Sequence, residues 1–99
     1  MPSAHLRSAN LRGADLQGAG LTDADLRYAN LEDADLRDAD LYIVDLRDAD
    51  LRDATLNYSN LYEADLRDAD LRGAYLNNVR GWGANLRGAK LNDANLRGA

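Results

Sequence analysis

The stretch Ala34-Asp35-Leu36-Arg37-Asp38 is one unit of a five-residue repeat that runs through most of this 99-residue chain. All 18 leucines fall on one register from Leu6 to Leu96, and Gly81 is the single break in it. All 17 alanines lie on a second register, two residues before the leucine slots, which is interrupted at Val44, Ser59 and Val79. Because neither a helix nor a strand has a period of five, the repeat must belong to a larger structure.

Within each unit, Ala and Leu flank an Asp or Asn, which is the inward–outward alternation of a short strand. The two residues that follow Leu are polar or Gly and can form a turn. One unit alone cannot bury its apolar pair, so the units must stack. The repeat therefore predicts a solenoid with Leu and Ala inside.

A second period of 20 residues predicts the number of units in each coil. The residue after Leu is arginine at 20-residue steps, in a column from Arg7 to Arg87. Another column with the same spacing holds Thr22, Tyr42, Tyr62 and Trp82. Four units per coil follow from this spacing, with coils at about 3–22, 23–42, 43–62, 63–82 and an incomplete coil at 83–99.

The chain resembles the pentapeptide-repeat family, whose signature A(D/N)LXX is matched by Ala24-Asp25-Leu26, Ala49-Asp50-Leu51 and Ala94-Asn95-Leu96. The resemblance implies an all-β fold, a right-handed quadrilateral β-helix of about five coils of 20 residues. We expect residues 1–99 to form a single domain.

Composition excludes several classes of protein. No cysteine is present, which excludes disulfides and thiolate sites. No apolar run is long enough for a membrane span or a signal peptide, so we expect a cytoplasmic protein that does not bind membranes. The net charge of −5 is unevenly spread, because residues 23–72 carry 15 acids against six arginines, whereas residues 73–99 carry four cations against Asp93.

The column Tyr42, Tyr62 and Trp82 is the candidate protein-interaction stripe, with Ile43 beside it. Outward aromatics one coil apart favour contact with a partner, but the same column is also typical of cross-strand stacking that only stabilises the face. The sequence leaves both interpretations open.

The arginine column has a structural and a functional interpretation. Each arginine could be neutralised by an acid nearby, either the Asp before the same Leu (Asp25, Asp45, Asp65) or the Asp after the arginine (Asp48, Asp68). The acidic middle could instead mimic duplex DNA, since some members of the family inhibit DNA gyrase in this way. The basic section at residues 73–99 argues against such a mimic.

No catalytic, cofactor-binding or metal-binding site is expected. The single histidine, His5, has no partner for a catalytic dyad, and the stacked Asp residues lack the glycine-rich repeat of calcium-binding β-rolls. We therefore expect a scaffold or a protein-interaction module with an unknown protein partner and no nucleic-acid ligand. The alternative is an acidic rod that binds a type II topoisomerase or another DNA-handling protein.

Three structural expectations follow from the stacking. Leu46 should be buried between Leu26 and Leu66 on the neighbouring coils. The coil at the C-terminal end should associate end to end with a second copy, because it carries unpaired strand edges and apolar side chains. At the gap left by Gly81, the indole of Trp82 either stays outside on the aromatic column, which the unbroken register favours, or turns inward to cover the gap.

Overall fold

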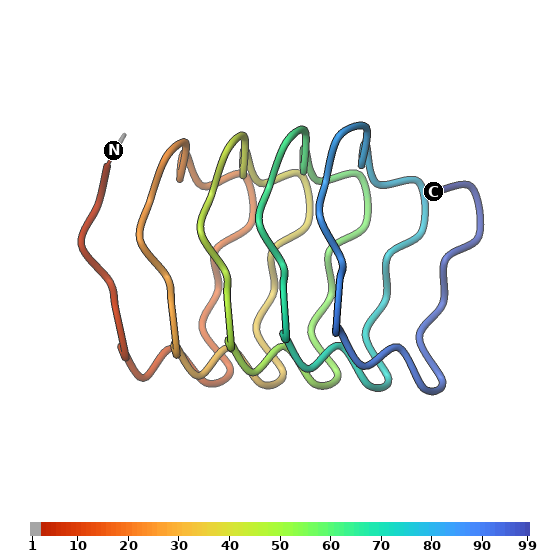
Figure 1. The fold of residues 1–99 in the computed structure, drawn as a ribbon, viewed down its shortest axis with the longest axis horizontal. Coiled ribbons are helices and arrows are strands. Elements are labelled where there is room, and N and C mark those ends of the chain that lie inside the picture. Colours follow the sequence, from red (N-terminus) through yellow and green to blue (C-terminus); the bar gives the residue numbers. More distant parts are fainter. Residues whose placement is uncertain (1–2) are drawn as a thin grey trace.

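The computed structural model describes residues 3–99, which wind into a coil with successive turns lying side by side along one axis (Figure 1). The two ends of the chain lie at opposite ends of this axis. The principal extents are 29, 25 and 21 Å, so the solenoid is short and nearly as wide as it is long.

Parallel backbone bridges hold the coils together, and each joins two residues that are 20 positions apart. They run from His5↔Asp25 to Tyr75↔Asn95 and always use the residue before a leucine slot. At a typical bridge the amide of Leu46 donates to the carbonyl of Asp65 at 2.8 Å, and the amide of Asp65 donates to the carbonyl of Val44 at 2.9 Å. The 20-residue period read from the side chains is thus also the hydrogen-bonding period.

Residues 3–99 contain neither a helix nor a strand longer than a single bridged residue. The sequence predicted a short strand in each pentapeptide. In the structure only one residue of each pentapeptide is paired in a bridge. The physical reason is that the turn takes two residues of every five, which leaves only the residue before Leu flanked by ladder hydrogen bonds on both sides.

Each corner is a tight turn closed by a hydrogen bond from the next alanine to the leucine carbonyl, as from Ala49 to Leu46 at 3.1 Å. The second residue after Leu has a positive φ at nearly every turn, which suits Gly, Asn and Asp. Ile43 occupies this slot with φ of 49°. A β-branched residue in the left-handed region is strained, so this turn stores energy that an asparagine would not.

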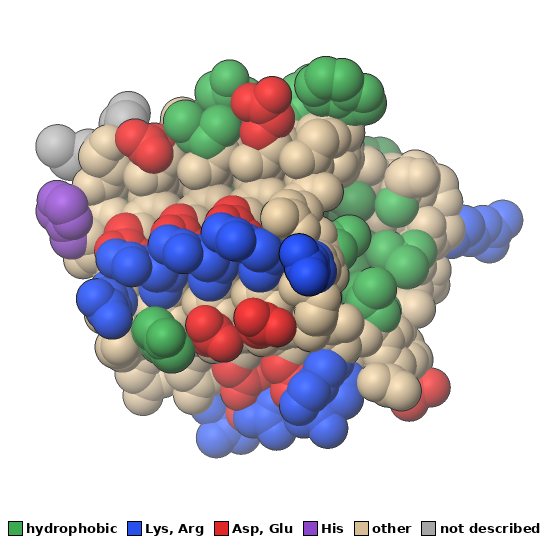
Figure 2. All heavy atoms as spheres, in the orientation of Figure 1, with side chains coloured by type: hydrophobic (Ala, Val, Ile, Leu, Met, Phe, Trp, Pro, Cys, Tyr) green, Lys and Arg blue, Asp and Glu red, His purple; other side chains and the backbone are tan. Residues whose placement is uncertain are grey.

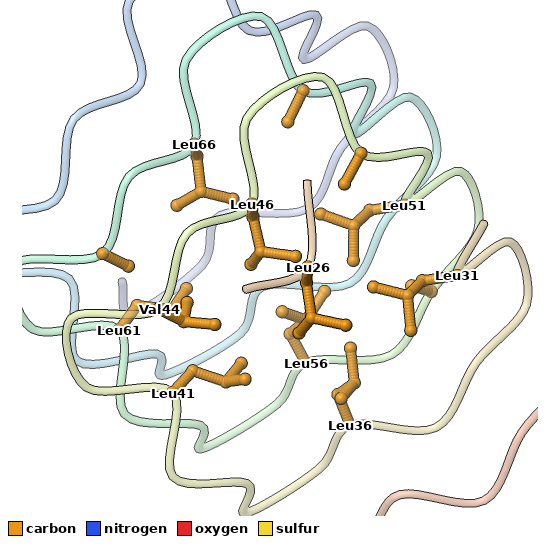
Figure 3. Packing of buried hydrophobic residues seen from close by; sticks show 14 of the residues in the cluster. Leu26, Leu31, Leu36, Leu41, Val44, Leu46, Leu51, Leu56, Leu61 and Leu66 are labelled. Carbon is orange, nitrogen blue, oxygen red and sulfur yellow. The ribbon is translucent and has the colours of Figure 1, made fainter. Parts of the chain in front are cut away.

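The interior is a column of leucines and alanines that are most deeply buried in the middle of the solenoid. Leu46 is fully buried, and Leu26 and Leu66 occupy the same place on the coils beside it (Figure 3), which confirms the predicted stacking. Ser59 takes an alanine position and is also fully buried, with no hydrogen-bond partner for its hydroxyl among the described residues. Towards both ends the leucines become partly exposed.

Candidate protein-interaction site

The predicted aromatic stripe lies on the surface. Tyr42 and Tyr62 are 40% and 42% exposed, and Trp82 is 73% exposed. The rings of Tyr62 and Trp82 meet edge to face, with centroids 6.2 Å apart and planes at 69°. Such a pair stabilises the face by about 0.5–1.5 kcal/mol and still leaves most of the indole available to a partner.

An apolar hollow opens at the C-terminal end of the coil, next to this stripe. Its volume is about 430 Å³, and Gly81, Trp82, Leu86, Leu91 and Leu96 are among the residues that line it. Leu86 and Leu96 are 38% and 44% exposed, although their register places them in the leucine column. Figure 2 shows apolar side chains gathered at this end of the molecule. Exposed leucines around a concave surface are typical of a protein-binding site.

Gly81 enlarges the hollow because it places no side chain in a leucine slot. A Cβ built on Gly81 would meet no atom within 4 Å. Trp82 keeps its outward position against Tyr62, as the unbroken register favoured, and its indole borders the hollow without filling the leucine slot. The gap therefore remains open.

The arginine column in the middle of the chain is neutralised by the Asp two residues before each arginine. The Nε and Nη2 atoms of Arg47 donate to the two carboxylate oxygens of Asp45 at 2.9 and 2.7 Å. The same forked pair recurs at five other arginines: Arg27, Arg37, Arg52, Arg67 and Arg72. Asp48 and Asp68, which follow arginines in the sequence, form no ion pair among the described residues.

These arginines also contact the neighbouring coil, and they lower the pKa of the carboxyl groups that they pair with. Arg27 lies 3.6 Å from Asp45 on the next coil, and Arg47 lies 3.7 Å from Asp65. The hydrogen bonds from the Arg47 side chain lower the pKa of Asp45 below its ordinary value of 3.8, and burial opposes this only in part. The pKa of the other five paired carboxyls is lowered by the same cause: Asp25, Asp35, Asp50, Asp65 and Asp70. Figure 2 shows rows of Lys and Arg side chains in blue beside Asp and Glu side chains in red along the face in view.

The four cations of residues 73–99 differ from the arginines of the middle, since none of them forms an ion pair with any of residues 3–99. Asn85 and Asn95 stand where Asp precedes Leu elsewhere. Their side-chain oxygens accept the backbone amides of Arg87 and Arg97 at 3.0 and 3.1 Å, but they carry no charge. The apolar hollow therefore lies on a coil whose arginines form no ion pair with any of residues 3–99.

No group of three or more residues able to hold a metal ion occurs among residues 3–99, and this part of the chain contains no helix suited to crossing a membrane. His5 lies in the first coil and is bridged through its backbone to Asp25.

The family model described as "Pentapeptide repeats (8 copies)" matches residues 4–41, 45–80 and 64–99. The chain belongs to the pentapeptide repeat family. Among curated protein sequences, none matches the chain.

Solved structures of pentapeptide repeat proteins are similar to this chain. HetL from the cyanobacterium Nostoc sp. strain PCC 7120, involved in the regulation of heterocyst differentiation, is 40% identical with a TM-score of 0.96 over 97% of the chain. Rfr23 from the cyanobacterium Cyanothece 51142 is 33% identical with a TM-score of 0.61 over 96% of the chain. The chain spans 40% of the length of HetL and 62% of that of Rfr23.

QnrB1, a plasmid-mediated fluoroquinolone resistance protein, is 21% identical with a TM-score of 0.51. The aligned part covers 90% of this chain and 58% of QnrB1. At this identity the likeness shows a common fold and nothing further. The pentapeptide-repeat neighbours together identify the fold of the chain as a right-handed β-helix.

Sequence reasoning found the aromatic stripe, the gap at Gly81 and the apolar side chains of the C-terminal coil, but it did not predict that they line one hollow. The exposed leucines Leu86 and Leu96 look like any other leucine of the pentapeptide repeat in the sequence. The absence of ion pairs at Arg87 and Arg97 could have been predicted, because Asn85 and Asn95 replace the aspartates that neutralise arginines elsewhere.

Proposed function

We propose that this pentapeptide repeat protein is a non-enzymatic, cytoplasmic scaffold or protein-interaction module. The observation that carries the proposal is the apolar hollow of about 430 Å³ at the C-terminal end, next to an exposed tryptophan. A partner that covers Leu86, Leu96 and Trp82 would remove a large apolar surface from water, which is the main driving force for association. The likeness to HetL, a protein involved in regulation, supports a role in binding rather than in chemistry.

The proposed surface combines the stripe of Tyr42, Tyr62 and Trp82 with the hollow. Exposed Tyr and Trp side chains are enriched at binding hot spots because they bury a large area and lose little conformational entropy. Ile43 adds an exposed apolar side chain beside the stripe despite its strained backbone. Such strain is often retained where a side chain has a functional use.

The geometry proposed for the module is a single domain, a quadrilateral β-helix of about five coils. The 20-residue bridges and the four pentapeptides between bridged residues support four sides to each coil. This shape presents an apolar end on which another apolar surface can stack.

When no other partner is present, the proposed occupant of the hollow is a second copy of the chain, which gives an end-to-end homodimer through the C-terminal coil. Sedimentation velocity from low to high micromolar concentration tests this proposal. We expect a monomer–dimer equilibrium that Leu96→Asp abolishes, because a carboxylate in the hollow would be desolvated on association. Tyr58→Ser is the matched control, since Tyr58 is exposed but lies outside the hollow. A strict monomer, or equal effects of both variants, would contradict the proposal.

The acidic mimic of duplex DNA is the second candidate, and the net charge of −9 over residues 23–72 favours it. Seven of the acids in that segment, Glu32 among them, are already paired with arginines, so the free charge lies on the remaining acids, many of them at turns. A gyrase supercoiling assay separates the two candidates. Inhibition that rises with protein concentration and disappears at high salt would favour the mimic, and unchanged supercoiling would exclude it.

A further inference from the structure

The carboxylate of Asp40 lies on the face that carries the aromatic stripe and has no arginine of its own. Six aspartates that precede a leucine slot are each held by the arginine two residues later, as Asp45 is held by Arg47. Two residues after Asp40 the chain has Tyr42 instead. Asp40 is exposed and forms no ion pair with any of residues 3–99. The position that a guanidinium occupies at the other six aspartates is therefore open to solvent here.

The backbone holds this carboxylate as it holds the paired ones. The Oδ1 atom of Asp40 accepts the amide of Tyr42 at 3.2 Å and the side-chain amide of Asn60 at 3.4 Å. The Oδ1 atom of Asp45 accepts the amide of Arg47, also at 3.2 Å, and accepts the guanidinium as well. The Oδ2 atom of Asp40 accepts no hydrogen bond from the described residues. Asp40 thus has the backbone contact of a paired aspartate and lacks only the guanidinium.

The ring of Tyr42 offers a second contact to the same guanidinium. Elsewhere in the chain the guanidinium carbon of Arg7 lies 5.5 Å from the centroid of the Tyr28 ring, which is a cation–π contact. Tyr42 is exposed and follows Asp40 at the spacing that separates arginine from aspartate in the paired sites. An arginine from outside can therefore pair with the carboxylate and stack on the ring. Arginine suits this site better than lysine, because its planar fork matches two carboxylate oxygens and stacks on aromatic rings.

Apolar side chains and a second unpaired acid lie beside this pair. The amide of Ile43 donates to the carbonyl of Tyr62 on the next coil at 3.0 Å, which places these two residues side by side. Both side chains are exposed. Glu63 follows Tyr62, is exposed and forms no ion pair within residues 3–99. The surface is therefore apolar with a negative border, which complements a partner that is apolar and positively charged.

This surface belongs to the middle of the solenoid, where a coil has neighbours on both sides (Figure 1). Asp40 is bridged to Gly20 on one side and to Asn60 on the other, so its surroundings do not depend on either end of the chain. Arg80 is bridged to Asn60 one coil further on and forms no ion pair with the described residues. Two inter-strand spacings place its backbone roughly 10 Å from that of Asp40, so it does not replace the missing arginine.

We propose that Asp40 and Tyr42 bind an arginine side chain of a partner protein, whose neighbouring apolar residues contact Ile43 and Tyr62. The guanidinium takes the position that an arginine of the chain itself takes at the six paired aspartates. The inference rests on the proposed interaction role of the aromatic stripe and names the chemistry of the partner.

The probe is the blocked peptide acetyl-Leu-Arg-Leu-amide, titrated into the 99-residue chain at physiological ionic strength, where long-range attraction is screened. The control peptide has citrulline in place of arginine, which keeps the shape of the side chain and removes its charge. Binding is followed by the NMR shifts of the amides of residues 40–43 and 61–63.

Both peptides are also titrated into Asp40→Asn, which completes a double-mutant cycle, and into Asp15→Asn. Asp15 is the matched control position, because it also precedes a leucine slot and accepts the amide two residues later, at 3.2 Å. It is likewise followed by no arginine, but its neighbour is Gln17 instead of an aromatic residue.

We expect saturable binding of the arginine peptide to the parent chain in the millimolar range, with shifts centred on the two segments. The citrulline peptide should bind about fivefold more weakly, and so should the arginine peptide to Asp40→Asn. In Asp40→Asn the two peptides should differ by less than about twofold. Asp15→Asn should bind as the parent chain does. Tyr42→Leu should weaken the arginine peptide by about threefold, because it removes the face of the ring.

Equal losses of affinity in Asp40→Asn and Asp15→Asn would overturn the inference. Equal binding of the two peptides at residues 40–43 would overturn it as well, but the stripe would then still be an apolar contact surface and the proposed interaction role would stand. If neither peptide binds, the inference fails, and the sedimentation of the chain alone decides separately whether the interaction role of the C-terminal coil stands.

Discussion

Filling the gap at Gly81 should stabilise the protein, and Gly81→Leu is the perturbation that shows it. The slot belongs to the leucine register, and a Cβ there meets no atom within 4 Å. Gly81 is also absent from the residues with positive φ, so a side chain brings no backbone strain. The new leucine would lie against Leu61, Leu66 and Leu86 on the wall of the hollow.

The magnitude follows from how far the slot is open. Full burial of a leucine contributes about 2 kcal/mol, and the neighbouring Leu86 and Leu96 are 38% and 44% exposed, so about half of that is available, roughly 1 kcal/mol. Loss of a glycine from the unfolded chain adds about 0.5 kcal/mol. We expect a gain of about 1.5 kcal/mol, which corresponds to a rise in Tm of roughly 6–12 °C for a domain of this size.

The assay is urea denaturation followed by far-ultraviolet circular dichroism, at a protein concentration where sedimentation shows both proteins to be monomeric. Gly83→Ala is the control, because Gly83 has φ of 77° and its Cβ would lie 3.0 Å from the Cγ of Glu63. That variant should lose about 1 kcal/mol. A loss of stability in Gly81→Leu would refute the reasoning, since it would mean that the indole of Trp82 or another group already fills the slot.

Four other predictions concern the Arg–Asp ion pairs, the buried hydroxyl of Ser59 and the strained turn at Ile43. Arg47→Ala should lower the free energy of unfolding by about 0.5–1 kcal/mol and Arg87→Ala by almost nothing, because only Arg47 holds a carboxylate; equal losses in urea denaturation would contradict this. Six aspartates have a pKa below 3.8 in the folded state, so the unfolded chain binds more protons than the folded chain as the pH falls through about 4. The free energy of unfolding should therefore be constant above that pH and decline below it. The decline should be less steep in Asp45→Asn. Ser59→Ala should raise the free energy of unfolding by about 1–2 kcal/mol, since it removes a buried hydroxyl without a partner; no gain would reveal an acceptor for that hydroxyl. Ile43→Asn should stabilise the chain by about 1 kcal/mol in the same assay, because asparagine tolerates the left-handed φ of 49°, and a loss would mean that the isoleucine makes a compensating contact.

The β-helix and the stacking of its coils could be predicted from the sequence, because two periods act on the same residues. The five-residue period places Leu46 inside, and the 20-residue period places Leu26 and Leu66 on either side of it, as the structure shows. The length of each side could not be predicted as well. Alternation of Ala, Asp and Leu suggests a strand. Whether one or three residues of a pentapeptide are paired with the next coil depends on how many of its five residues form the turn.

The candidate site was predictable only in part, because some of its features follow from the register of the repeat and others do not. Outward position follows from the register, so Tyr62 and Trp82 were predicted on the surface. Apolar side chains were also expected on the C-terminal coil, but the degree of exposure of Leu86 and Leu96 could not be predicted, because it depends on their neighbours in space and not on the pentapeptide itself. The partner of each arginine was also left open, and the structure selects Asp45 over Asp48 for Arg47 because the forked geometry is reached two residues back.

The emission of Trp82 tests the interaction role most directly, because this single tryptophan borders the hollow and is 73% exposed. The account predicts emission typical of a water-exposed indole at low micromolar concentration. It further predicts a blue shift when the concentration is raised, and no such shift in Leu96→Asp. An emission maximum that stays unchanged through high micromolar concentrations would contradict the claim that this end of the β-helix is a binding surface.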